Sequence, residues 1–379
     1  MARLKKRYSI PLILLFCTLI VLLYASFQSY RYPSHVELAQ KSKYLARIIQ
    51  SPIDDHSDIY HLKHQNEEWM LFTLSFSTFA LTNMAYLDSS FTSSAATLID
   101  TAIQQAMTEP IYHRYSSHNP LSPEIDTNGS ILYFGHLNMM LGCYRKLTTN
   151  PKYNDLSNRL SACIYNQYTR SDYRNLESYP QKIWIPDNAA GIASLYLHSQ
   201  ITGSAYSRMC AEWVKAARER YTDPETGLLY STVDYSTGKA LEEPRGSMIG
   251  WSIFFIYRFD KGFARELYEK YKDTFSTNLI ALRLYNERKH VNSTNLGDLD
   301  SGPILWGYSI PAAAFAFGDA VAMQDWHEAE KLHRLVSIGS KLVQNGDEMR
   351  YQPRIGDLNF SPLAESLGLY FETMTEWKR

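Results

Sequence analysis

Long apolar stretches with helical spacing dominate the chain beyond residue 30. The clearest are residues 69–86, 131–147 and 189–200, where apolar side chains cover much of the helix circumference. A helix of this kind is buried on more than one side, so it belongs to the interior of a layered helical fold. The pattern therefore predicts an all-α domain.

The helices follow a repeat with two markers. The first is an aromatic residue that opens every second helix after a short polar turn, at spacings of 62, 53, 57 and 63 residues: Phe91, Tyr153, Tyr206, Phe263 and Trp326. The second is a polar junction before each intervening apolar helix, built from residue types that cap helices and marked by Gly129, Asp187, Gly246, Asp300 and Ser361.

This spacing fits antiparallel helix pairs with long return connections. It predicts a closed α/α toroid of helix hairpins over residues 31–379, with residues 36–60 as an incomplete extra pair. All polar junctions would then meet on one rim, where such an architecture is expected to bind its ligand. Alternation and turn residues in 222–238 break the helical period and predict a small β-hairpin over that rim.

The N-terminus has the pattern of a membrane anchor. Basic residues at positions 3–7 precede an uncharged apolar run over residues 10–27, and 18 helical residues span about 27 Å. Because a bulky Tyr24 occupies a place where signal peptidase needs a small residue, we favour an uncleaved signal anchor (residues 1–30, helix about 9–27) over a cleaved signal peptide. The positive-inside rule then puts residues 31–379 in the periplasm or outside the cell, attached to the cytoplasmic membrane.

Charge and motifs exclude several classes of function. The 38 basic and 39 acidic residues give a net charge of −1, which excludes a nucleic-acid binder that neutralises phosphates. Phosphate-loop, dinucleotide, zincin and nucleophile-elbow motifs are absent from the sequence, so we expect no cofactor and no metal. Cys143, Cys163 and Cys210 have no zinc spacing, and we interpret them as buried helix residues while leaving a Cys143–Cys163 bridge open.

Acidic and basic side chains gather at the predicted rim. His136 lies in an apolar helix, where an imidazole needs a hydrogen-bond partner, and Asp298 and Asp300 are paired on one side of an extended segment just before a helix. Helix capping by Asp300 and a satisfied core histidine are the alternatives. The candidate catalytic residues are His136, Asp187, Asp298 and Asp300, and the candidate substrate-binding residues are Tyr133, Trp184, Asn188, Arg245, Trp306 and Tyr308.

Several motifs in residues 60–345 resemble the linalool dehydratase-isomerase family. They are Gly135-His-Leu-Asn138, Thr222-Asp-Pro-Glu-Thr-Gly227 and Asp298-Leu-Asp-Ser-Gly302. The resemblance implies an (α/α)6 barrel and a cofactor-independent interconversion of a tertiary allylic alcohol with an isomer and an alkene. It matches His136 to the family's active-site histidine.

The chain also departs from that family. The two family cysteines on the next inner helix are missing, Asp187 stands where the second would fall, and Phe72 replaces a family tyrosine. Three functions follow as hypotheses: acid/base chemistry at a C–O bond of a small hydroxylated molecule (lyase or isomerase), glycan processing by a glycosidase or epimerase, and a non-catalytic envelope scaffold. The expected partners are such a molecule or a glycan, together with the membrane; a homo-oligomer is left open.

Overall fold

The computed structural model describes residues 29–290, 296–298, 301–354 and 359–378, with scattered positions between 16 and 27. Most of the predicted anchor and Asp300 lie outside these residues. Within the described part, one helix is long and apolar enough to cross a membrane, α4 (Glu68–Leu87), and 89% of its apolar window is buried inside the fold. We therefore assign α4 to the protein core.

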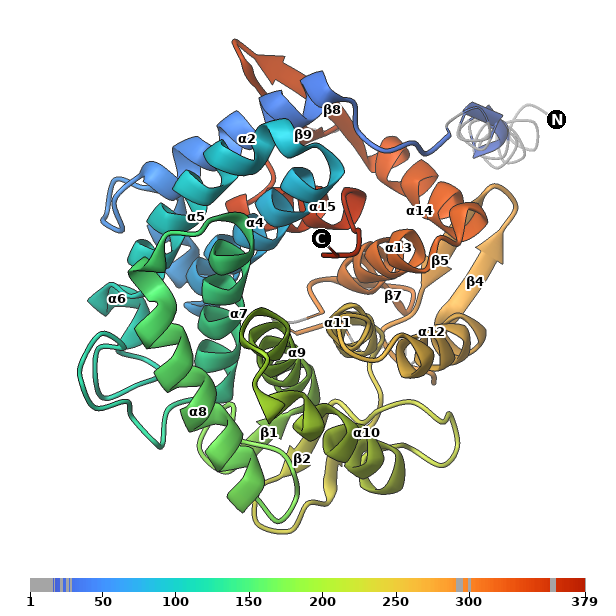
Figure 1. Cartoon of the computed structure of the whole chain (residues 1–379). Coiled ribbons are helices and arrows are strands. Elements are labelled where there is room, and N and C mark those ends of the chain that lie inside the picture. The colour runs from blue at the N-terminus through green and yellow to red at the C-terminus, as the bar shows by residue number, and fades with distance from the viewer. Residues whose placement is uncertain are drawn as a thin grey trace, which may run out of the picture.

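An inner ring of six helices forms the centre of the described chain. Each inner helix packs against the next, and the last packs against the first, so the ring is closed (Figure 1). Its members are α4, α7 (Ile131–Leu147), α9 (Ile185–Thr202), α11 (Gly246–Ile256), α13 (Ile310–Met323) and α15 (Pro362–Glu372). This confirms the predicted α/α toroid.

A second layer of amphipathic helices surrounds the inner ring. In α8, for example, the buried residues Leu156, Leu160 and Ile164 recur at helical spacing, so one face packs inward and the other meets solvent. The outer helices are α2 (His35–Gln50), α5 (Thr92–Ala106), α8 (Asn154–Arg170), α10 (Arg208–Arg220), α12 (Lys261–Phe275) and α14 (Trp326–Gly339). Short α3 (Asp58–His61) and α6 (Glu109–Tyr112), with 3₁₀ turns at Leu62–His64, Ser89–Phe91, Pro151–Tyr153 and Ala205–Ser207, complete the helical part.

Residues 36–60 do not form the incomplete extra pair that the repeat predicted. They hold one long outer helix, α2, followed by a bend and the single turn of α3. α2 packs against α5, α15 and α4, so it is the outer helix at the seam where the ring closes. The repeat misled here because the inner helix at this seam, α15, comes from the other end of the chain.

The described residues also form four small β-sheets. β2 (Thr232–Asp234) pairs with β1 (Lys182–Trp184) and β3 (Ala240–Glu242) in antiparallel order β1-β2-β3. The hairpin predicted over 222–238 is therefore displaced, since residues 222–229 form a turn closed by a bridge from Thr222 to Leu229. The other hairpins are β4 (Ser276–Leu279) with β5 (Leu282–Tyr285), β6 (Ile304–Leu305) with β7 (Tyr308–Ser309), and β8 (Ser340–Asn345) with β9 (Glu348–Pro353).

Two further sequence predictions are settled by the described residues. The helix expected directly after Asp300 begins only at Ile310 and is capped by Ser309, because the β6–β7 hairpin intervenes. Cys143, Cys163 and Cys210 are free thiols, so the Cys143–Cys163 bridge is absent. Cys143 and Cys210 are buried in helices, as expected, whereas Cys163 lies in α8 but is only half-buried, so the expectation of burial is wrong for it.

Candidate active site

The N-terminal ends of the inner helices define one rim of the barrel. Each outer helix and its return connection bring the chain back to the same end, as Figure 1 shows down the ring. Asp187 lies in the first turn of α9, and Arg245 is the residue that precedes α11. His136 lies in the second turn of α7, so the ring places these three predicted residues on adjacent helices near one rim.

His136 is completely buried, and only one of its two ring nitrogens has a hydrogen-bond partner among the described residues. Its Nδ1 lies 2.8 Å from the Ser75 hydroxyl oxygen of α4, and that hydroxyl donates to the Phe72 carbonyl oxygen at 3.2 Å. Because the Ser75 hydrogen is used in this way, we assign the tautomer in which Nδ1–H donates to Ser75 and the lone pair lies on Nε2. Among the described residues, Nε2 has no hydrogen-bond partner, and burial lowers the pKa of His136 to about 3.

Five aromatic rings surround the His136 imidazole, with centroids 5.1 to 6.2 Å away. This aromatic cage consists of Phe72, Phe76, Phe79, Trp251 and Phe255. Phe72 and Trp251 retain 7% and 9% exposure, and the centroids of their rings lie 4.9 Å apart. The Trp251 indole nitrogen is a second buried polar atom without a partner among the described residues.

The Gly135-His-Leu-Asn138 motif has a packing explanation. A Cβ at Gly135 would lie 2.9 Å from the backbone nitrogen of Gly191, so glycine lets α7 and α9 cross closely. Asn138 donates to Ser194 of α9 and accepts from Ser161 of α8, both at 3.0 Å. The motif therefore fixes three helices around the turn that carries His136.

Asp187 lies beside two tyrosines. It is 5% exposed. Burial raises the pKa values of Tyr115 and Tyr168, and the negative charge of Asp187 raises both further. The Tyr115 hydroxyl is buried and has no hydrogen-bond partner among the described residues. Nothing in the sequence singled out Tyr115, since it lies in a polar loop after α6. Asn188, by contrast, donates to two carbonyls and accepts from two donors, and thus holds the return loop to α9.

Arg245 forms hydrogen bonds to two carboxylates across the rim and lies 3.6 Å from a third, that of Glu242. Its Nε donates to Glu287 at 2.8 Å and its Nη2 donates to Asp298 at 2.7 Å. Glu287 also accepts from the Ser247 hydroxyl at 2.7 Å. Burial would raise the pKa of Asp298, but hydrogen bonds from Ser301 and the Arg245 charge outweigh it and hold this pKa below its usual value. Glu287 was missed because its neighbours, Asn286 to His290, are polar and predict an exposed loop.

The remaining predicted residues have varied surroundings. The Tyr133 hydroxyl donates to the Ala106 carbonyl oxygen at the end of α5, so this ring packs between layers. Trp184 directly precedes α9, with its indole nitrogen buried and without a partner among the described residues. Trp306 is 88% exposed at the tip of the β6–β7 hairpin, and Tyr308 lies half-buried in β7.

The family model for linalool dehydratase/isomerase matches residues 107–334, which include α7 through α13 and the Arg245 ion pairs. The chain belongs to the linalool dehydratase/isomerase family. The matched span contains His136, Asp187 and the Asp298 segment. This agrees with the resemblance inferred from the sequence motifs.

Solved structures of α/α toroid enzymes share the fold. An unsaturated glucuronyl hydrolase specific for heparin has a TM-score of 0.56 at 12% identity, covering 93% of this chain and 96% of its own. The unsaturated glucuronyl hydrolase of Streptococcus agalactiae has a TM-score of 0.55 at 12% identity (90% and 92% covered). A family 105 glycoside hydrolase of C. acetobutylicum has a TM-score of 0.53 at 13% identity (88% and 99%). At these identities the likeness concerns the fold alone.

Proposed function

We propose that the protein is a cofactor-independent lyase or isomerase that acts at a C–O bond of a small hydroxylated compound with an apolar body. Family membership supports this class of reaction. The observation that carries the proposal is the buried Nε2 of His136, which lacks a partner among the described residues and lies within an aromatic cage. A buried polar atom inside apolar walls suits a ligand with one hydroxyl group and a hydrocarbon skeleton.

The imidazole would act on the substrate as a neutral group. With the proton on Nδ1, the Nε2 lone pair accepts a hydrogen bond from the substrate hydroxyl. The pKa of about 3 makes His136 neutral at pH 7, so it does not supply the proton that the leaving oxygen needs. We assign the transfer of that proton to the carboxyl groups of Asp187 and Asp300.

The cage suits the intermediate of such a reaction. Protonation of the hydroxyl oxygen lets water leave with the C–O electron pair, and a carbocation forms. Loss of a proton from the adjacent carbon gives the alkene, whereas return of water at another carbon gives the isomeric alcohol. Aromatic faces stabilise a cation by about 0.5 to 2 kcal/mol each. Phe72 and Trp251 are the cage rings that retain residual exposure.

The Arg245 cluster is better suited to holding the rim together than to glycan hydrolysis. Glycosidases need two carboxyl groups about 5 to 5.5 Å or 6.5 to 9.5 Å apart around the scissile bond. Asp298 and Glu287 both bind the Arg245 guanidinium, and Glu287 is almost fully buried. Because the Ser301 hydrogen bonds and the Arg245 charge hold the pKa of Asp298 below its usual value, Asp298 does not resemble a proton donor, and we place it among the residues that shape the site.

We also propose that residues 9–27 anchor this domain to the cytoplasmic membrane, with the barrel in the periplasm or outside the cell. The charge pattern at the N-terminus supports this orientation. Tyr30, Tyr32 and Trp326 form an aromatic cluster just after the apolar run, with centroid distances from Trp326 of 6.2 and 5.7 Å. Tyrosine and tryptophan favour the membrane–water interface.

The function is tested by product analysis with the full chain in mild detergent. The protein is incubated with linalool, with myrcene and, separately, with envelope polysaccharides. We expect conversion between the two terpenes by gas chromatography and no release of sugars. Released oligosaccharide without terpene conversion would contradict the lyase/isomerase proposal and favour glycan processing.

A further inference from the structure

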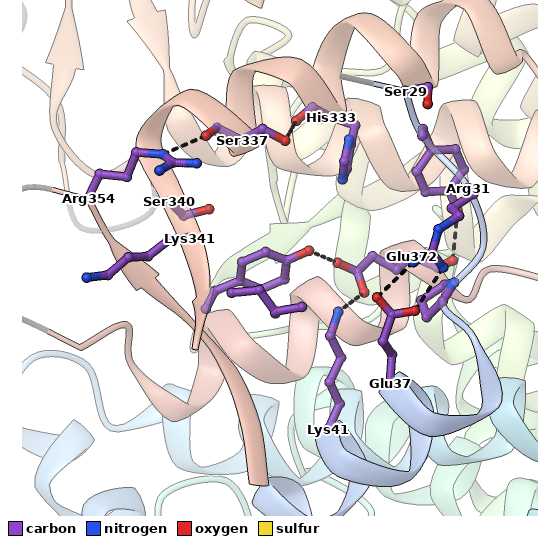
Figure 2. A pocket seen from close by; sticks show the side chains of 14 residues that line it. Ser29, Arg31, Glu37, Lys41, His333, Ser337, Ser340, Lys341, Arg354 and Glu372 are labelled. Carbon is purple, nitrogen blue, oxygen red and sulfur yellow. Dashed lines mark hydrogen bonds and ion pairs between the residues drawn. The ribbon is translucent and has the colours of Figure 1, made fainter. Parts of the chain in front are cut away.

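A separate cavity lies at the seam where the ring closes. It has a volume of about 290 Å³ and opens between α2, α14, the β8–β9 hairpin and the C-terminal end of α15 (Figure 2). Its walls include residues 29–31 and 33, which follow the apolar N-terminal run. Because this is the end of the barrel where α15 finishes, the cavity lies away from the rim that carries Asp187 and Arg245.

The walls of the cavity carry an excess of positive charge. Two carboxylates are already neutralised: Glu372 binds Lys41 and the Tyr351 hydroxyl, and Glu37 binds Arg31 at 2.8 and 3.1 Å. The lining nevertheless contains four cationic side chains against these two carboxylates, an excess of two positive charges: Arg31, Lys41, Lys341 and Arg354.

Lys341 and Arg354 are the cations that remain for a ligand. Among the described residues neither has a carboxylate partner; Arg354 donates from Nε to the Ser337 carbonyl oxygen at 2.8 Å. Figure 2 shows both at one end of the cavity, with Arg31 and Glu37 at the other. Between them lies His333, whose buried Nδ1 lacks a partner in the described structure. Cationic side chains with an additional polar atom form the usual setting for an oxyanion such as phosphate.

The cavity lies beside the end of the apolar N-terminal run. Arg354 Nη2 donates to the hydroxyl of Tyr24, a residue of that run, at 3.4 Å. The chain is held there because the Tyr30 and Tyr32 hydroxyls donate to the carbonyl oxygens of Glu372 and Met374 at 2.9 and 3.1 Å. Two extended residues reach about 7 Å, so Ser29 in the cavity wall is within that distance of Phe27, where the run ends.

We propose that this cavity binds the phosphate of an anionic phospholipid headgroup, with Lys341 and Arg354 as the contacts for the phosphate oxygens. Free inorganic phosphate shares this chemistry, but the end of an apolar run brings lipid headgroups to the cavity mouth. The choice of lipid as the source rests on the proposed membrane anchor, whereas the site itself rests on the cavity and its charge. Lipid bound here would hold the seam between α2 and α14 against the bilayer surface.

Binding is tested with the full chain in nonionic detergent, by titrating dihexanoyl phosphatidylglycerol and following the melting temperature and native mass spectra. We expect saturable binding that dihexanoyl phosphatidylcholine does not match. Replacing both exposed cations, Lys341→Gln with Arg354→Gln, should weaken binding by about 10-fold to 100-fold, because each charge-assisted hydrogen bond contributes about a factor of ten.

The matched control is Lys215→Gln with Lys239→Gln. It also removes two positive charges, from exposed positions on α10 and the β2–β3 turn. This control should bind as the parent protein does. Equal weakening in both double variants would overturn the site, because it would show an effect of net charge. Inorganic phosphate that binds as tightly as the lipid would overturn the assignment of a lipid headgroup. Terpene conversion is measured in parallel, so failure of the proposed reaction is recorded separately.

Discussion

The buried ion pair of Arg245 should be one of the strongest single determinants of rim stability. We consider Arg245→Met, which keeps an unbranched side chain and removes the charge. Arg245 and Glu287 are each 2% exposed, whereas Asp298 is 50% exposed. Removing one partner of a buried pair costs about 3 to 5 kcal/mol, because the other charge stays buried without compensation. The half-exposed Asp298 contact adds at most about 1 kcal/mol.

The free energy of unfolding is measured by urea titration with circular dichroism. The expected loss for Arg245→Met is about 3 to 5 kcal/mol, and Arg245→Met combined with Glu287→Gln should cost less than the sum of the single changes. Arg218→Met is the control, because its ion pair with Glu266 has exposed fractions of 44% and 36% and should contribute at most about 1 kcal/mol. A loss for Arg245→Met no larger than that of the control, or strict additivity in the double variant, would refute the reasoning.

Three further predictions concern packing, pH and chemistry. Gly135→Ala should lower the free energy of unfolding by about 1 to 3 kcal/mol in the same urea assay, because the new Cβ would lie 2.9 Å from the backbone of α9. The control Gly339→Ala, whose Cβ would have no atom within 4 Å, should leave the free energy of unfolding unchanged. Burial raises the pKa of Glu365 to about 8, so the folded state holds a proton that the unfolded state loses near pH 4.5. The free energy of unfolding therefore falls as pH rises from 4.5 to 8. Glu365→Gln should flatten that pH dependence in thermal melts. Asp300→Asn should reduce turnover by about 10²-fold to 10⁴-fold without changing the melt, whereas Cys143→Ala should retain turnover. Full activity in Asp300→Asn would contradict the assignment of proton transfer to Asp300.

The repeat predicted the ring because helix periodicity and capping are local signals. Residues 131–147 were bounded correctly, since the apolar run ends at a polar turn on both sides. The predicted start of α13 was wrong by about ten residues, because β6 and β7 have two residues each and are too short to show an alternation of apolar and polar residues. Very short strands are specified by their tertiary partners, which no local pattern shows.

The same limit applies to the candidate site. A histidine in an apolar helix predicted the need for a partner, but Ser75 lies 61 positions earlier and only the closed ring brings it to Nδ1. The burial of Glu287 could not be predicted, because its own segment is polar and its burial comes from α11 packing over it. Arg245 was proposed as a substrate contact, and the structure uses its guanidinium to bind Glu287 and Asp298.

The central claim is that a hydroxylated substrate meets the Nε2 of His136 inside the aromatic cage. The most direct test compares linalool turnover by the parent protein, His136→Phe and the exposed control His327→Phe, together with their melting curves. We predict that His136→Phe keeps a folded, cooperative melt and loses at least about 100-fold in turnover, while His327→Phe retains both. Turnover by His136→Phe at the parent rate would contradict it.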